Sequence, residues 1–243
     1  MMSQTAATMR TIRAPAPPQA GVNRVLLVML PGATDLPEGF LRYGFVRALR
    51  ERQLPVDAVL ADAHMDYYLQ RNIGERIAHD AIIRTRTRDH RQIWLMGISL
   101  GGMGALIYAR DYPAAIDGMV LLAPFLGNRG TIAGIARGGG LNAWQPDAGK
   151  AQDDEQALLA WIKAYRYDDP ASPSIHLGYG TSDRFAAASE LLAQRLPAAH
   201  VTAMPGGHDW DTWTRLWEGL LDRGLFANCA TAGAPQAHAG ANS

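Results

Sequence analysis

Residues 93–102 form the sequence Ile93-Trp94-Leu95-Met96-Gly97-Ile98-Ser99-Leu100-Gly101-Gly102. The apolar run at its start is too short for a helix and is typical of a buried strand. The Gly-x-Ser-x-Gly spacing from Gly97 to Gly101 is typical of a sharp turn between a strand and a helix, with the serine in a strained backbone conformation. A Cβ at either glycine would collide with neighbouring backbone in such a turn. Ser99 is therefore the predicted nucleophile, and a chance match of this short motif is the alternative.

Apolar runs of similar length recur on both sides of this stretch. They are rich in Val, Ile and Leu, and we predict them as buried strands: Val25–Leu30, Val56–Leu60, Met119–Leu122, Ile175–Tyr179 and Val201–Met204. Segments with helical spacing lie between them: Phe40–Gln53, Ile73–Thr85, Gly101–Tyr112, Glu155–Tyr167, Ala186–Leu196 and Trp210–Leu221. This alternation predicts an α/β fold whose mostly parallel sheet is covered by helices on both faces.

The composition fits such a domain and excludes several other classes of protein. Of 243 residues, 48% are hydrophobic and 19% are charged, which excludes intrinsic disorder of the whole chain. Basic and acidic residues number 23 each. The chain therefore lacks the excess of basic residues that is typical of proteins that bind nucleic acid or an anionic membrane. The single cysteine, Cys229, excludes an internal disulfide framework, and no apolar run approaches the roughly 20 residues of a membrane span. We expect a cytoplasmic globular protein.

Both ends of the chain are predicted to lie outside the folded domain, which then spans residues 23–226. Residues 1–22 contain an Ala-Pro run and no acidic residue, which predicts a flexible extension, with a transit peptide as the alternative. Residues 227–243 are predicted as a disordered tail. Residues 127–154, after the fourth predicted strand, form a long glycine-containing insertion that is a candidate lid or cap. A disordered insertion is the alternative.

A serine nucleophile needs a base and an orienting acid, and later strands supply both. Asp183 and His208 each follow the carboxyl end of a predicted strand, where loops can bring them to Ser99. We predict that His208 takes the Ser99 proton and later delivers it to the leaving group, while Asp183 fixes the imidazole tautomer. Asp209 and Asp211 are the alternative acids, but their closeness to His208 in sequence makes the geometry awkward and they fit helix caps.

The surroundings of Ser99 are predicted from weaker signals. The backbone N–H groups of Leu100, at the helix start, and of Ala33, in the loop after the first strand, are the candidate oxyanion donors. Candidate substrate-pocket residues are Tyr67, Tyr68, Phe125 and Trp144. An ordinary polar loop is the alternative for Tyr67 and Tyr68, and a disordered insertion is the alternative for the segment with Phe125 and Trp144. Three tryptophans at helical spacing are predicted to pack in the core: Trp210, Trp213 and Trp217.

The segment Gly97–Leu106, followed by Tyr112-Pro113, resembles the nucleophile region of the α/β-hydrolase superfamily, and within it the serine esterases of the esterase D-like group. The segments Gly180–Asp183 and Gly206–Trp210 are similar to the acid and histidine segments of that group. The resemblance implies a sheet of the α/β-hydrolase type and a serine hydrolase acting on small-molecule acyl esters or thioesters, with no cofactor or metal. This chain departs from many relatives in having Pro31-Gly32 where they have His-Gly in the oxyanion loop.

Other functions stay open from the sequence, a peptidase or a lipase among them. An acyltransferase would use the same three residues, with an alcohol or amine replacing water as the acceptor. A non-catalytic binding protein could keep the fold, although binding alone needs no aligned base beside Ser99. The short segment before Val25 could also leave out the early antiparallel edge strands of the superfamily.

Overall fold

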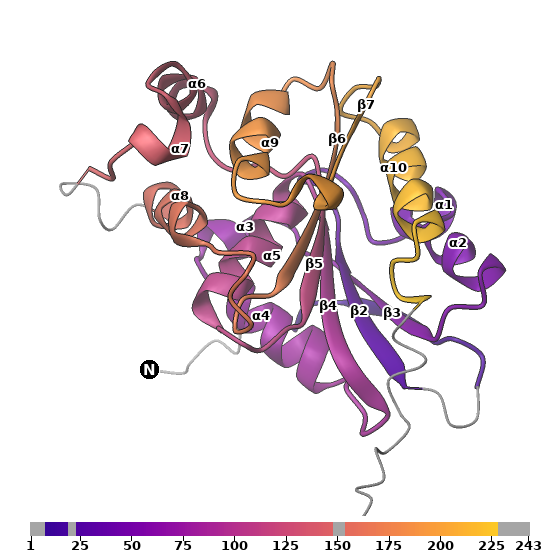
Figure 1. Cartoon of the computed structure of the whole chain (residues 1–243). Helices are drawn as coiled ribbons and strands as arrows, with labels where there is room; N and C mark the ends of the chain where they lie inside the picture. Colours follow the sequence, from indigo (N-terminus) through magenta and orange to yellow (C-terminus); the bar gives the residue numbers. More distant parts are fainter. Residues whose placement is uncertain (1–7, 19–22, 148–153, 228–243) are drawn as a thin grey trace, which may run out of the picture.

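The computed structural model describes residues 8–18, 23–147 and 154–227, which fold around one twisted sheet (Figure 1). Its strands are β1 (Thr11–Ala14), β2 (Arg24–Leu30), β3 (Val56–Ala61), β4 (His90–Ile98), β5 (Gly118–Leu122), β6 (Ser174–Gly180) and β7 (Val201–Met204). The strand order is β1-β3-β2-β4-β5-β6-β7, with β1 antiparallel and all other pairs parallel. The predicted fold class and the six predicted strands are thereby confirmed.

Helices cover both faces of this sheet (Figure 1). On one face lie α1 (Gly39–Arg42), α2 (Phe45–Glu51) and α10 (Trp210–Asp222). On the other lie α3 (Met65–Leu69), α4 (Ile73–Arg76), the π-helix η1 (Ile77–Ile83), α5 (Leu100–Asp111) and α8 (Asp154–Ala164). Near the carboxyl ends of the later strands are α6 (Arg129–Arg137), α7 (Gly140–Ala143) and α9 (Ala186–Ala193). The 3₁₀ turn η3 (Ala198–His200) leads directly into the amino end of β7.

The continuous apolar runs are explained by burial on both faces of the sheet. In β2, every residue from Val25 to Leu30 is at most 1% exposed. A strand between two helical layers has no face toward water, so it does not alternate apolar and polar residues. The helix predicted over Phe40–Gln53 is instead broken at Gly44, whose φ of 80° lies in the left-handed region that glycine adopts readily.

The prediction of a flexible extension over residues 1–22 is wrong for residues 8–18. Strand β1 pairs with β3 from Thr11↔Ala61 to Ala14↔Ala58 and supplies an antiparallel edge strand. Two carboxylates, one buried and one half-buried, fix the flanking backbone: Asp80 accepts the Met9 N–H (2.9 Å) and Asp57 accepts the Ala16 N–H (2.7 Å). Four residues of mixed polarity give no periodic signal, so only these long-range contacts define the strand. The rest of the predicted extension lies outside the described residues.

The predicted insertion contains regular structure over residues 127–147. Helix α6 begins at the N-cap Asn128, whose side chain accepts the Thr131 N–H at 3.0 Å. Its apolar residues Ile132 and Ile135 are buried, so α6 has a packed inner face. The remaining six residues of the insertion and all but the first residue of the predicted C-terminal tail lie outside the described ranges. Among the helices that are described, none combines the length and apolarity needed to cross a membrane.

The central strands should carry most of the stability of the domain. Leu121 in β5 is fully buried, whereas Leu69 at the end of α3 is 74% exposed. We expect Leu121→Ala to lower the free energy of unfolding by about 2–5 kcal/mol, since it removes buried methyl groups and leaves a cavity. The matched control Leu69→Ala should change it by less than about 0.5 kcal/mol. Urea unfolding of both variants measures this, and equal losses would contradict the burial described above.

Candidate active site

Ser99 occupies a sharp turn between β4 and α5. Its φ of 51° and ψ of −114° place a non-glycine residue in a sparsely populated backbone region, at a cost of about 1–3 kcal/mol. Backbone hydrogen bonds hold it there: the Ser99 N–H donates to Leu122 O (3.0 Å), and Ser99 O accepts from the Phe125 N–H (2.9 Å). A Cβ added at Gly97 would lie 2.3 Å from Gly101 O, and one at Gly101 would lie 2.1 Å from Leu30 O. The turn therefore requires both glycines of the motif.

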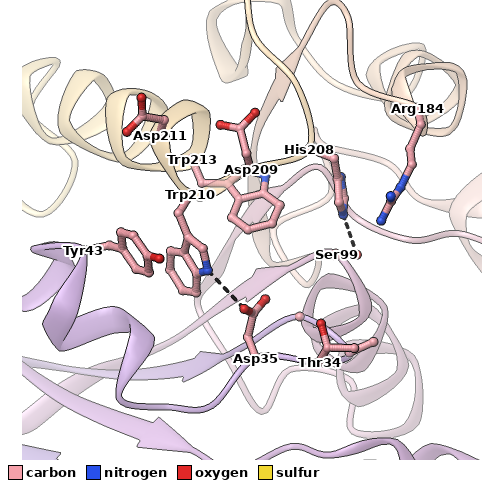
Figure 2. A pocket seen from close by; sticks show the side chains of 12 residues that line it. Thr34, Asp35, Tyr43, Ser99, Arg184, His208, Asp209, Trp210, Asp211 and Trp213 are labelled. Carbon is pink, nitrogen blue, oxygen red and sulfur yellow. Dashed lines mark hydrogen bonds between the residues drawn. The ribbon is translucent and has the colours of Figure 1, made fainter.

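Three predicted site residues meet at this turn, and Figure 2 shows two of them, Ser99 and His208. Ser99 Oγ lies 3.0 Å from His208 Nε2, and His208 Nδ1 lies 2.7 Å from Asp183 Oδ2. The side chain of Asp183 is fully buried, and its other oxygen accepts the Phe185 N–H at 2.7 Å. In the tautomer that forms both contacts, Nδ1–H donates to the carboxylate and Nε2 accepts the serine proton. This arrangement can raise the nucleophilicity of Ser99 Oγ.

Aromatic side chains hold the imidazole in this orientation. The ring of Phe185 lies 4.9 Å from that of His208 at 72°, and the ring of Trp213 lies 5.0 Å away at 89°. The rival acid Asp209 is engaged elsewhere, since its side chain caps α10 by accepting the Thr212 N–H at 2.8 Å. That backbone hydrogen bond lowers the pKa of Asp209 below its ordinary value. The sequence expectation that Asp209 caps a helix matches this geometry.

The two candidate oxyanion donors lie on either side of Ser99. Leu100 is the first residue of α5, and the first N–H groups of a helix have no carbonyl partner within it. Ala33 lines the same cavity as Ser99, and a Cβ at the preceding Gly32 would lie 3.8 Å from Ser99 Cβ. The Pro31-Gly32 departure is accommodated by a turn in which the Asp35 N–H donates to Gly32 O at 3.1 Å.

A cavity of about 550 Å³ opens beside Ser99 and His208. Its wall includes Tyr43 and Trp210, whose rings stack at 4.6 Å and 8° (Figure 2). Trp210 Nε1–H also donates to Asp35 at 3.1 Å. Trp213 lines the cavity as well. The core-packing interpretation is thus right for Trp217, which is fully buried, and incomplete for Trp210 and Trp213. Their position just after His208 is the signal that could have placed them here.

The predicted substrate-pocket residues do not line this cavity. Tyr67 and Tyr68 lie in α3 after β3, and Tyr68 packs against α5, where a Cβ at Gly104 would lie 2.5 Å from its hydroxyl oxygen. Trp144 is at the end of α7, where its carbonyl accepts from Lys163 Nζ. Phe125 comes nearest, packing edge-on against Phe185 at 5.8 Å. Across the described ranges, no group of three His, Cys, Asp or Glu side chains is placed to hold a metal ion.

Comparison with known proteins finds a partial match to one sequence family and hydrolases among the proteins of similar structure. Residues 75–167 match the family described as serine aminopeptidase, S33; the match contains the Ser99 turn and ends before Asp183 and His208. A search of curated protein sequences finds no match. Among solved structures, the chain is similar to S-formylglutathione hydrolase from Staphylococcus aureus, with 17% identity, a TM-score of 0.55 and coverage of 83% of this chain and 82% of that one.

Two further structures extend the likeness over most of the chain. A peroxisomal alpha-beta-hydrolase from Saccharomyces cerevisiae gives a TM-score of 0.61 at 13% identity, covering 98% of this chain and 88% of that one. An S-formylglutathione hydrolase from Agrobacterium tumefaciens gives 0.56 at 14% identity, covering 91% of each chain. The resemblance to the α/β-hydrolase superfamily is confirmed. The chain has the α/β-hydrolase fold, and its residues 75–167 carry the sequence pattern of a serine hydrolase family.

The cap formed by Asp209 should give a pH-dependent contribution to stability. Because folding lowers the pKa of this carboxyl, its contribution is complete above the ordinary value of about 3.9 and is lost as the pH falls through the lower folded value. We expect Asp209→Ala to cost about 1 kcal/mol of unfolding free energy at neutral pH, with the difference shrinking toward about pH 3. Asp209→Asn keeps an acceptor, so it should lose less. Urea unfolding across this range measures both, and a cost that does not change with pH would contradict the carboxylate cap.

Proposed function

We propose that this chain is a serine hydrolase that cleaves carboxylic esters or thioesters through an acyl-enzyme on Ser99. The observation that carries the proposal is the continuous hydrogen-bonded chain from Ser99 through His208 to Asp183, open to a cavity of about 550 Å³. A strained serine, a base within 3.0 Å and a buried carboxylate together are what acyl transfer needs.

The proposed reaction has two halves. Ser99 Oγ attacks the carbonyl carbon while His208 Nε2 takes its proton, and the N–H groups of Ala33 and Leu100 stabilise the negative oxygen of the tetrahedral intermediate. The protonated imidazole then donates to the leaving alcohol or thiol, which departs and leaves the acyl group on Ser99. Water repeats the sequence, with His208 as base, and releases the acid. Asp183 accepts from Nδ1 throughout and stabilises the imidazolium.

Esters and thioesters are favoured over peptides by the structural relatives. Two of them are S-formylglutathione hydrolases, named for a thioester, and another is a ferulic acid esterase. All are below 20% identical to this chain, so they support a substrate class and no individual substrate. An acyltransferase would show itself in the same assays as an acylated product when an alcohol or amine is added.

Labelling with a fluorophosphonate tests the nucleophile directly. We expect one covalent adduct per chain by intact mass, and peptide mapping should locate it on Ser99. Ser99→Ala should give no adduct and should lower ester hydrolysis by at least about 10³-fold. Folding of the variant is checked by its unfolding midpoint. A folded wild-type chain that takes up no probe, or an adduct on another residue, would overturn the proposal.

The choice of the acid is tested by paired Asp→Asn variants. Asp183→Asn should lower kcat by roughly 10³–10⁴-fold, because the amide favours the wrong imidazole tautomer. Asp209→Asn, which alters the rival acid that caps α10, should lower kcat by less than about tenfold since it leaves the His208 contact intact. Steady-state kinetics on an activated ester separates the two. A larger loss for Asp209→Asn would reassign the orienting acid.

A further inference from the structure

A second cavity, of about 370 Å³, adjoins the first. Ile132 and Ala133 of α6 form one wall, and Phe185 and Ala188, at the start of and within α9, form the other. These side chains carry no polar groups, so the walls suit an alkyl or acyl chain. Helix α6 lies in the insertion after β5, which gives that insertion a direct part in shaping the cavity.

Two guanidinium groups stand at this cavity. Arg129 and Arg184 both line it, with their Cζ atoms 5.5 Å and 5.1 Å from the ring centroid of Phe185. Within the part of the chain that the structure describes, neither arginine forms a hydrogen bond or an ion pair. The acid at the start of α8, Glu155, is already engaged, since its carboxylate accepts from the Asn128 N–H (2.9 Å) and Nδ2–H (3.0 Å). Both cations are therefore available to a ligand.

Arg184 connects this cavity to the proposed nucleophile. It lines the first cavity together with Ser99 and His208, and its side chain extends toward them (Figure 2). Phe185 separates the imidazole from the second cavity, with its ring 4.9 Å from that of His208. A chain attached to the carbonyl at Ser99 can therefore pass Arg184 and enter the second cavity.

The charges of the two cavities are opposite. Three carboxylates and one arginine line the first cavity, those of Asp35, Asp209 and Asp211 and that of Arg184, whereas two arginines and no carboxylate line the second. An anionic group would be repelled in the first cavity and attracted in the second. This difference in charge gives an ester substrate a preferred orientation. It favours a substrate that carries a negative charge on the half that occupies the second cavity.

We propose that Arg129 and Arg184 form an anion-binding subsite, so that the substrate is an ester or thioester bearing a carboxylate at the end of a short apolar chain. The chain would lie between α6 and α9, and its carboxylate would take hydrogen bonds from the planar guanidinium groups. This inference rests on the proposed function for the ester bond, while the binding of the carboxylate can be measured without turnover.

The binding test uses Ser99→Ala and two pairs of ligands, measured by calorimetry. Monomethyl adipate and dimethyl adipate differ by a charge on the acyl half; ω-acetoxyhexanoate and its methyl ester differ by a charge on the alcohol half. We expect the anion of one pair to bind about tenfold more tightly than its neutral partner. Adding Arg184→Gln or Arg129→Gln should reduce that ratio severalfold, and Arg184→Lys should restore part of it.

Arg137→Gln is the matched control, because Arg137 belongs to the same helix as Arg129 and does not line either cavity. It should leave the ratio unchanged. Equal binding of anion and neutral ester in both pairs would overturn the proposal, and so would an equal loss in the Arg137→Gln variant, which would indicate a general charge effect.

Rates of ester hydrolysis distinguish a failure of the proposed subsite from a failure of the proposed hydrolase activity. With the wild-type chain, kcat/KM should favour the same anionic ester by about tenfold, and the arginine variants should lose most of that preference, measured as the ratio of kcat/KM for the anionic ester to kcat/KM for the neutral one. Hydrolysis of neutral and anionic esters at equal kcat/KM would leave a serine hydrolase without the subsite. Absence of both fluorophosphonate adduct and hydrolysis, with the binding ratio intact, would leave the subsite without the hydrolase.

Discussion

The lack of space around the Ser99 turn constrains the rest of the structure. The backbone of α5 begins against the end of β2, so closely that a Cβ at Gly101 would lie 2.1 Å from Leu30 O. This close packing goes with a sharp turn at Ser99, whose φ is 51°. Backbone hydrogen bonds hold this conformation: the Ser99 N–H donates to Leu122 O at the end of β5, and Ser99 O accepts from the Phe125 N–H. The strain at the serine is thus offset by the packing of the sheet, and any loosening of β2, β4 or β5 would relax it.

The parallel sheet turns this local strain into a site. Because β4, β6 and β7 run in the same direction, their carboxyl ends meet at one edge, and the loops that follow carry Ser99, Asp183 and His208. His208 is 109 residues from Ser99 in sequence and 3.0 Å away in space. The aromatic rings of Phe185 and Trp213 then fix the imidazole. Rigid strand ends and packed rings give a preorganised arrangement, and preorganisation is what stabilises charge that develops during a reaction.

The charged side chains around the site are distributed unevenly between the two cavities. Carboxylates from the first loop and from the start of α10 line one cavity, and arginines from α6 and the α9 loop line the other. The formal net charge of zero conceals this separation. Composition therefore gave no information about the charge around the site, since the local field depends on which few side chains converge.

The sequence by itself determined the fold class, six of the seven strands and the three residues that meet at the turn. These signals are local: an apolar run buried on both faces, a glycine spacing required by a tight turn, and polar residues just after strands. Tertiary structure decided strand β1, the break of the first helix at Gly44 and the lining of both cavities. Tyr67 and Tyr68 follow a strand end as Asp183 does, yet Tyr68 packs against Gly104 of α5 and neither tyrosine lines the cavity beside Ser99. The order of the strands in the sheet is fixed by packing among residues that are distant in sequence. A local sequence pattern does not contain that information.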